Sequence, residues 1–394
     1  MAGVDRKAMG ALSSGHLAVD LAQGALPAFL PFLVIKFDLT YTMAAALVLA
    51  ATISSSVVQP AFGLWSDARG ALWLLPAGVL LGGFGMAAAT VAPSYPLLLL
   101  AVLVAGLGVA AYHPEGSKFA SYVSGDRRAS GMSFFSIGGN VGFALGPLLA
   151  SFAIVTLGLG LEGGAIVALP GLVIAAVLIA ARPYLATFAP TVTRRRGEAR
   201  ERSDRRGMSL LISVIGLRSL AHMGLFTFVP LWEVAKGHSA VYGTRLLAGF
   251  LLAGALGTLA GGPLADRFGR RRVLLWSFVV ASPLVFTYAL VGGLVGGIAL
   301  VLSGAAIIGT FGVSLVMSQE YMPARVGVAS GLSIGFAIGL GGVAAVFLGA
   351  LADAIDLEAA IVACAVGPAL AAALTLLLPP SRRAPRMEPA AAPI

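Results

Sequence analysis

Twelve long apolar runs restrict the folds that this chain can adopt. A bilayer core about 30 Å thick needs roughly 20 apolar residues per helix. Only 11% of the 394 residues are charged, whereas soluble domains carry about a quarter. We therefore expect an all-α polytopic membrane protein with twelve transmembrane helices. Divided at charges, prolines and turn residues, the runs lie near 11–35, 43–65, 71–91, 95–116, 128–157, 163–181, 208–233, 243–265, 272–292, 295–319, 325–352 and 357–378.

The basic residues gather in alternate loops and predict the orientation. With both termini in the cytoplasm, Lys36, Lys236 and Arg245 fall outside, Arg218 falls within a helix, and every other basic residue falls inside. Cytoplasmic loops carry such an excess of Lys and Arg. We therefore expect a multi-pass protein of the bacterial cytoplasmic (inner) membrane. The net charge of +9 is then explained by the basic cytoplasmic loops, and nucleic acid is not an expected partner.

The halves of the chain repeat. Three short matches share an offset of 199 or 200 residues, which predicts a duplication and two pseudo-symmetric six-helix bundles enclosing a central site. The matches are GLWSDARG (63–70) with GPLADRFG (262–269), ASGMS (129–133) with ASGLS (329–333), and FLPFL (29–33) with FVPLW (228–232).

The charged stretch RPYLATFAPTVTRRRGEARERSDRRG at 182–207 lacks apolar periodicity and is typical of a solvated linker. We expect an N-terminal bundle over 1–181, this linker, a C-terminal bundle over 208–378, and a disordered cytoplasmic tail over 379–394.

Three polar residues interrupt the first apolar run. His16, Asp20 and Gln23 are spaced to lie on roughly one helical face. An ionisable group at mid-membrane costs at least roughly 2.5–3.5 kcal/mol, so it persists where it faces a cavity or a partner. Asp20 is our candidate proton carrier. The alternative is a polar knot that holds this helix to its neighbours.

A second polar pair lies in the seventh run, the repeat partner of the first. Arg218 and His222, one turn apart, are expected to face the same cavity as Asp20. There Arg218 could pair with Asp20, bind an anionic substrate, or do these in turn. If the helix begins later, Arg218 would instead snorkel to the interface. The candidate hydrogen-bonding residues of the cavity, which could equally cross-link helices, are Gln23, Gln59 and Asn140.

The segment GGPLADRFGRRRVL (261–274) is a candidate gate. Gly262 would allow close helix contact, and Asp266 could cap the next helix or accept from Arg267 or Arg270, in a cluster that breaks as the halves rock. The first half keeps part of this pattern, and the alternative is an ordinary basic loop. The residues of the first-half copy are Gly63, Asp67 and Arg69.

Two acids lie at equivalent helix ends. Glu115, near the end of the run 95–116, and Glu320, at the end of 295–319, could form inner-gate salt bridges with Lys118 or Arg325. A solvated interface pair is the alternative.

Several motifs resemble a known superfamily. The segment 261–274 is similar to the G-x-L-x-D-R-x-G-R-R signature of the major facilitator superfamily. SIGGNVGFALGPLLA (136–150) carries Gly142, Gly146 and Pro147, which favour close helix approach and free a carbonyl. It partly resembles the glycine-proline motif of the superfamily's antiporters, without the trailing glycine pair.

The block YHPEGSKFASYVSGDRRASGMSFFSIGGNVGFALGPLLA (112–150) and the helix containing His16, Asp20 and Gln23 resemble the fosmidomycin resistance protein family. The resemblance implies proton-driven export of a drug or small metabolite by a protein that usually works as a monomer. His113, which opens the His-Pro motif, joins His16, Asp20 and Glu115 as a candidate for proton coupling.

The leading hypothesis is therefore a proton-coupled, alternating-access exporter, with Arg218 favouring an anionic substrate. The alternative is a proton symporter or facilitator that imports a sugar or an organic acid. A membrane enzyme or a non-transporting sensor is less favoured, because no hydrolase or metalloprotease motif and no long soluble segment occurs. With Cys364 as its one cysteine, the chain is expected to hold no metal or cofactor.

Overall fold

The computed structural model describes residues 3–69, 71–125, 127–189, 204–322 and 326–379, and within them all regular structure is helical. The helices of the first half are α1 (Arg6–Gly24), α2 (Leu26–Phe37), α3 (Tyr41–Ser56), α4 (Gln59–Arg69), α5 (Leu74–Val91), α6 (Tyr95–Val123), α7 (Arg128–Ser151), α8 (Gly160–Gly163) and α9 (Ala168–Ala186). Those of the second half are α10 (Arg205–Ala235), α11 (Ala240–Phe268), α12 (Arg270–Val291), α13 (Gly293–Ile308), α14 (Phe311–Tyr321), α15 (Val326–Ala354) and α16 (Leu357–Thr375).

Eleven helical spans among the described residues are long and apolar enough to cross a membrane. The 29-residue α15 supplies the twelfth, so the predicted all-α, twelve-span fold is confirmed. Several helices are longer than expected. Helix α6 continues to Val123 because Phe119, Ala120 and Val123 are buried, and α10 begins at Arg205. The predicted linker edges are thus partly helical, while residues 190–203 and 380–394 lie outside the described part.

Three of the described spans are divided in the middle. Helix α1 gives way to α2 at Ala25, α3 to α4 at residues 57–58, and α13 to α14 at residues 309–310. Pro27 and Pro60 follow the first two breaks, and proline supplies no backbone N–H to the helix. Residues that flank all three breaks line one central cavity. Irregular backbone at membrane depth is tolerated where it borders such a cavity.

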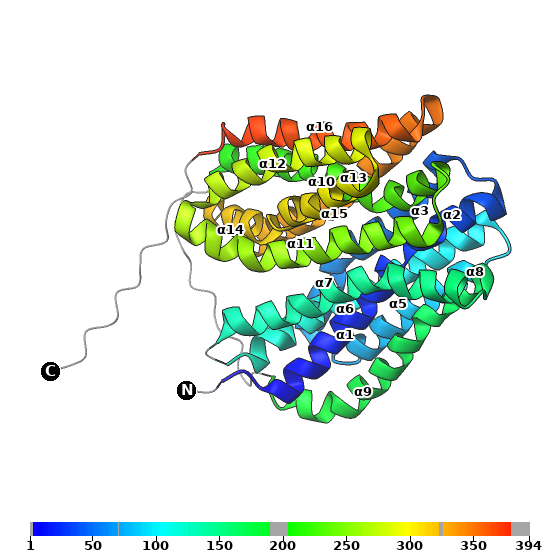
Figure 1. Cartoon of the computed structure of the whole chain (residues 1–394). Coiled ribbons are helices and arrows are strands. Elements are labelled where there is room, and N and C mark those ends of the chain that lie inside the picture. The colour runs from blue at the N-terminus through cyan, green and yellow to red at the C-terminus, as the bar shows by residue number, and fades with distance from the viewer. Residues whose placement is uncertain (1–2, 70, 126, 190–203, 323–325, 380–394) are drawn as a thin grey trace.

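The helices form two bundles, one from α1–α9 and one from α10–α16. In Figure 1, α1 and α5–α9 lie below α10–α16, and α2 and α3 lie where the two bundles meet. In the first bundle, glycines spaced four apart on α7 pack directly on the backbone of α1. A Cβ at Gly138, Gly142 or Gly146 would overlap the carbonyl oxygen of Ser13, Leu17 or Leu21, respectively. The predicted packing role of Gly142 and Gly146 is confirmed. Pro147 lies within α7, one residue beyond this contact.

The bundles meet where α3 packs against α15, α7 against α11, and α2 against α10. Asp353 of α15 accepts hydrogen bonds from the backbone N–H groups of Tyr41 (2.7 Å) and Thr42 (2.9 Å) and from the Thr42 hydroxyl (2.6 Å). Among side-chain hydrogen bonds and ion pairs between described residues, those of Asp353 join the two halves. We call the end of the molecule that holds these Asp353 contacts the latched end. It lies on the side of α2 and α3 in Figure 1, away from the chain termini.

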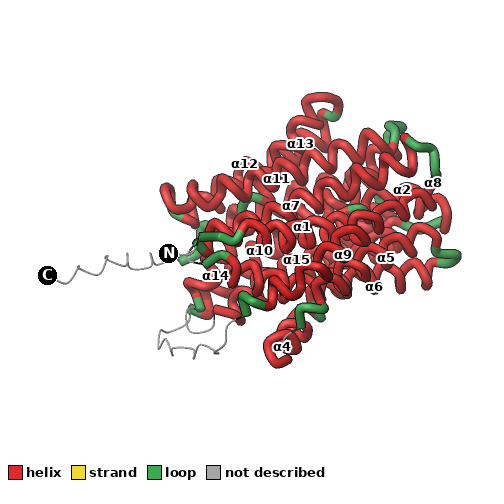
Figure 2. The backbone as a smooth tube through the Cα atoms, turned by 90° about the horizontal axis from the view of Figure 1, so that it is seen from below, coloured by secondary structure: helices red, strands yellow, loops and turns green. Residues whose placement is uncertain are grey.

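The short helix α4 projects from the side of the molecule, below the other helices in Figure 2. This segment carries the first-half copy of the candidate gate. Its sequence neighbours α3 and α5 lie within the bundle, so α4 is the part of the first half that extends farthest from the packed core.

Candidate functional site

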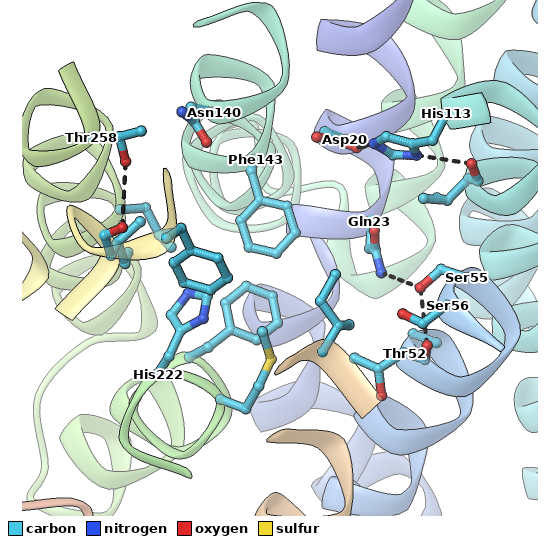
Figure 3. A pocket seen from close by; sticks show the side chains of 18 of the residues that line it. Asp20, Gln23, Thr52, Ser55, Ser56, His113, Asn140, Phe143, His222 and Thr258 are labelled. Atoms are coloured by element: carbon cyan, nitrogen blue, oxygen red, sulfur yellow. Dashed lines mark hydrogen bonds and ion pairs between the residues drawn. The ribbon is translucent and has the colours of Figure 1, made fainter. Parts of the chain in front are cut away.

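A cavity of about 390 Å³ lies between the two bundles. Side chains from both halves line it, as Figure 3 shows for Asp20, His113 and Asn140 of the first half and His222 of the second. This volume falls within the range of small-molecule sites, roughly 300–1,000 Å³. The predicted proton residues Asp20 and His113 line the cavity, and so do all the predicted substrate residues: Gln23, Gln59, Asn140, Arg218 and His222.

His16, Asp20 and His113 form one cluster on the first-half wall. The Asp20 carboxylate lies 3.3 Å from Nε2 of His16 and 3.3 Å from Nε2 of His113. These two Nε2 atoms are 3.0 Å apart. The His16 ring also stacks on Phe135, with 4.2 Å between ring centroids. The structure thus joins the helix 1 residues to the histidine of the His-Pro motif.

The hydrogen bonds of the two imidazoles fix their tautomers. Nδ1 of His16 lies 2.8 Å from the Phe135 carbonyl oxygen, and Nδ1 of His113 lies 2.9 Å from that of Val109. A carbonyl only accepts, so both Nδ1 atoms carry hydrogen. Without a further proton, both Nε2 lone pairs would face each other and the Asp20 carboxylate. One proton shared within the cluster removes that repulsion.

This cluster is not aimed at lipid. Asp20 and His113 border the cavity, and His16 is buried between α1, α6 and α7 through its contacts with His113 and Phe135. The ligand atoms of the three residues lie within 4.8 Å of one another, so the cluster can hold one small cation. The 3.0 Å between the two Nε2 atoms is a hydrogen-bond distance, with the Asp20 carboxylate close to both, so the cluster suits a proton.

Arg218 forms the positive part of the opposite wall. Its side chain is 1% exposed, which rules out the snorkelling alternative. The guanidinium donates to the hydroxyl of Ser314 (3.0 Å) and more weakly to that of Thr310 (3.5 Å), and it lies 3.7 Å above the Phe311 ring. Arg218 forms no ion pair with any described acid, and its Nε has no hydrogen-bond partner there.

His222 adds two unused polar atoms beside Arg218. Both ring nitrogens are buried without a partner among the described residues, and Figure 3 shows the ring at the cavity wall. Phe311 and Gly312, at the N-terminus of α14, line the same wall. Helix N-termini favour negative charge. A buried cation, a histidine and a helix N-terminus therefore border one part of the cavity, and no described acid pairs with the cation there.

The remaining cavity wall is polar on α3 and aromatic between the halves. The Gln23 amide donates to the Ser55 hydroxyl (3.3 Å), and the buried Ser56 hydroxyl has no partner among the described groups. Phe143 of α7 stacks on Phe226 of α10 with 4.9 Å between centroids. The cavity thus offers hydrogen bonds on one side, a positive charge on the other, and rings between them.

The acids at the helix ends tie loops within each half. Glu115 is fully buried, not solvated, because α6 extends beyond it. It pairs with Lys118 (2.8 Å) and accepts from the Ser66 hydroxyl and the Ala71 backbone N–H. This contact fastens the α4–α5 turn to α6, and Glu115 does not line the cavity.

The second acid, Glu320, pairs with Arg270, which joins α14 to the start of α12. Its predicted partner Arg325 lies outside the described residues. No described salt bridge of Glu115 or Glu320 crosses between the halves.

The candidate gate differs from the prediction in register. A Cβ on Gly262 would meet no described atom within 4 Å, so its expected close contact is wrong. The neighbouring Gly261 makes that contact instead, against the Gly309 carbonyl. Gly63 faces Pro114 at an ordinary 3.7 Å. The side chains of Asp67 and Arg69 lie outside the described part.

The charges of this segment are also arranged differently from the prediction. Gly269, not Asp266, precedes the first residue of α12, and no side chain caps that helix. Asp266 forms no ion pair with Arg267 or any other described residue, and Arg270 binds Glu320 instead.

Sequence reasoning missed several residues of the site. Ser314 and Thr310 are small hydroxyl residues in an apolar run, where nothing distinguishes them from packing residues. Asp353 lies near the end of a predicted helix, where an acid is typical of a solvated turn. Its link to Tyr41, 312 positions away, required the folded chain.

The sequence matches the Major Facilitator Superfamily over residues 12–346 and 246–393. It is 32% identical to the fosmidomycin resistance protein of Escherichia coli, over 95% of this chain and 93% of that protein. The chain belongs to the major facilitator superfamily. The match extends over nearly the whole length of both proteins, which places it with the fosmidomycin resistance proteins, as the motifs predicted.

Further similarities agree with this major facilitator assignment. The chain is 31% identical to YfnC, an uncharacterised MFS-type transporter of Bacillus subtilis, over 93% of this chain and 91% of that one. Its fold superposes on a bacterial homologue of the human lysosomal transporter Spinster with a TM-score of 0.76 at 18% identity, covering 94% and 96% of the two chains. The transporter FucP gives 0.61 at 18% identity, covering 95% and 100%. The chain is thus a membrane transporter in fold and in family.

Proposed function

We propose that this transporter exports a small anionic molecule in exchange for protons. The observation that carries the proposal is the cavity between the bundles, which has a proton-binding cluster on one wall and an uncompensated buried arginine on the other. The relative named for fosmidomycin resistance supports export. Drug efflux, and with it antibiotic resistance, is the finer role that we propose.

The anionic substrate is inferred from Arg218. A buried charge without a counter-ion is costly, and a site can bear that cost when its ligand brings the opposite charge. The Arg218 guanidinium, the unpartnered His222 ring and the Ser314 hydroxyl surround the same part of the cavity. Arginine suits oxyanions because its planar fork matches two oxygens at once. A carboxylate, phosphate or phosphonate therefore fits best.

The proton is assigned to His16, Asp20 and His113. Their geometry supports this assignment, because a shared hydrogen would remove the repulsion between the two Nε2 lone pairs and the Asp20 carboxylate, and Asp20 supplies the negative charge that would hold it. A substrate with hydrogen-bond donors could take the place of this proton at the Asp20 carboxylate while its anionic group binds Arg218. Binding and proton release would then be one event. Glu115 pairs with Lys118 and does not line the cavity, so we assign it a structural role, which is to hold α4 and the start of α5 against α6.

The energetics suit an exporter. One proton crossing a 100 mV potential supplies about 2.3 kcal/mol, and each unit of pH difference adds about 1.4 kcal/mol. One proton per cycle thus supports a substrate gradient of tens- to hundreds-fold. We further propose that the monomer works in the bacterial inner membrane with both termini in the cytoplasm. With this orientation the latched end would face outward, and we assign this structure to the inward-facing state on that ground.

The test uses purified protein in vesicles with an acidic lumen and fosmidomycin outside. If the protein exchanges the two, fosmidomycin should enter the vesicles as protons leave the acidic lumen, whichever way the protein is oriented in the membrane. A protonophore should abolish uptake, and Asp20→Asn should lose its dependence on the gradient. The control is Asp356→Asn, an exposed helix-capping acid far from the cavity.

Transport that is equal in Asp20→Asn and with the gradient collapsed would refute proton coupling. Uptake only into an alkaline lumen would assign the protein to symport instead. If fosmidomycin is not carried, other small phosphonates and carboxylates should be screened for binding, with Arg218→Met as the control. Binding that is identical in Arg218→Met would remove the anion assignment.

A further inference from the structure

A second hollow lies on the outer surface of the second half. We propose that it binds a phospholipid with an anionic headgroup, of the phosphatidylglycerol kind. The groove holds about 280 Å³ and shares no lining residue with the central cavity. It lies where α11 ends and α12 begins. Its lining residues are Leu264, Phe268, Arg272, Val273, Trp276 and Ser277.

The turn between the helices brings these side chains together. Gly269 alone separates α11 from α12, with a φ of 92° that favours glycine. The last turns of one membrane span therefore adjoin the first turns of the next. Both aromatic residues of the groove are strongly exposed: the relative exposed area is 64% for Trp276 and 50% for Phe268. Tryptophan is enriched at this level of a membrane, where hydrocarbon meets headgroups.

Four arginines surround the turn, and two of them are already used. Arg270 pairs with Glu320, and Arg271 donates to backbone carbonyls at the end of α16. Arg267 lies over the Phe268 ring at 5.2 Å, and Arg272 lines the groove. Neither Arg267 nor Arg272 has an acidic partner among the described residues. Arg272 is thus a cation without a described acidic partner in the wall of the groove, and Arg267 lies next to it over Phe268.

The groove fits an amphiphile better than it fits a free phosphate or a second copy of the chain. Its walls are apolar except at Arg272 and Ser277, which suits an acyl chain along the wall and a phosphate at the guanidinium. Basic pockets beside transmembrane helices bind anionic headgroups in this way. A free phosphate would leave the apolar wall uncovered. A second copy of the chain would need roughly 20–30 residues a side for a stable interface, and the groove has six.

The test measures which lipid lies beside Trp276. The full-length protein is placed in mixed phosphatidylglycerol and phosphatidylcholine vesicles, with bromine on the acyl chains of one lipid at a time. Bromine quenches a neighbouring tryptophan, so the two quenching values give a local preference. The variant Trp276→Phe identifies the part of the signal that comes from this groove.

We expect a several-fold preference for phosphatidylglycerol in the wild type and in Arg245→Gln, which removes an exposed arginine at the other end of α11. Arg272→Gln should bring the ratio close to one. An equal preference in Arg272→Gln, or none in the wild type, would overturn the proposal. So would a loss of Trp276 quenching that accompanies dimer formation, or inorganic phosphate displacing the preference. None of these results bears on transport, which the vesicle assay tests separately.

Discussion

Asp353 should control how often the transporter opens at its latched end. Its carboxylate accepts three hydrogen bonds at the first residues of α3, from the opposite half of the molecule. It therefore acts like a second N-cap supplied from the other bundle, beside the helix's own cap, Thr40. In alternating access the halves would separate here when the cavity opens on this side, so we expect the contact to be present in one state only. Asp353→Ala should favour the state that is open at the latched end.

The size of the effect follows from the chemistry of the cap. Removing an N-cap residue costs about 0.5–2 kcal/mol. Asp353 is exposed, so water can replace part of the lost hydrogen bonding, which lowers the cost. The cost is raised because the carboxylate is charged and accepts three hydrogen bonds instead of one. A value of about 1–2 kcal/mol shifts a two-state equilibrium by roughly 5- to 30-fold. The shift is confined to the conformational equilibrium, since the contact lies outside the cavity.

Spin labels can measure this equilibrium. Ile35 and Ile355 are strongly exposed and lie one on each half, near the latched end. The distance distribution between labels at these positions should gain a longer component in Asp353→Ala. Asp356→Ala is the matched control, because Asp356 caps α16 of its own half through Ala359. An unchanged distribution in Asp353→Ala, or an equal change in both variants, would refute the latch.

Three further outcomes follow from the cavity and the helix packing. Arg218→Met should abolish anion binding. It should also raise the free energy of unfolding of the substrate-free protein by on the order of 1–4 kcal/mol, and with it the melting temperature, because it removes a buried unpaired charge. A lower melting temperature would indicate a hidden counter-ion. Ser314→Ala should weaken anion binding about fivefold, through about 1 kcal/mol of lost hydrogen bonding to Arg218, whereas Thr258→Val, at the same cavity, should not. Gly142→Ala should destabilise the protein by about 1–3 kcal/mol through overlap with α1, and Gly262→Ala, which meets open space, should be neutral or stabilising in a thermal unfolding assay.

The membrane fold could be predicted because its signals are long and repeated. An apolar run of 20 residues has few alternatives in a chain with so little charge, and the 199-residue offset between GLWSDARG and GPLADRFG pairs the halves. The helix 1 cluster was also accessible. The spacing of His16 and Asp20 places them on one face whatever the tertiary packing, and the His-Pro motif supplied His113.

Contacts between distant segments could not be predicted in the same way. That Arg218 faces hydroxyl groups rather than Asp20 depends on where α13 ends and α14 begins, a break that the apolar run conceals. Gly261 and Gly262 are equivalent by composition, and only the direction of the helix face separates them. Asp353 looks like a turn acid until α3 is placed beside α15. In each case the sequence defines the residue's chemistry, while the partner comes from the packing of the bundles.

The direction of proton movement depends on where the substrate touches the cavity. An anion held at Arg218 alone would attract positive charge and strengthen proton binding at His16, Asp20 and His113, and the two would then travel together. Exchange requires the substrate to reach the other wall and replace the shared proton with its own hydrogen-bond donors. A cavity of about 390 Å³ with residues of both sites in its lining allows a small molecule to do so. Substrate binding to the purified protein in weakly buffered solution should therefore release protons, and proton uptake on binding would contradict exchange.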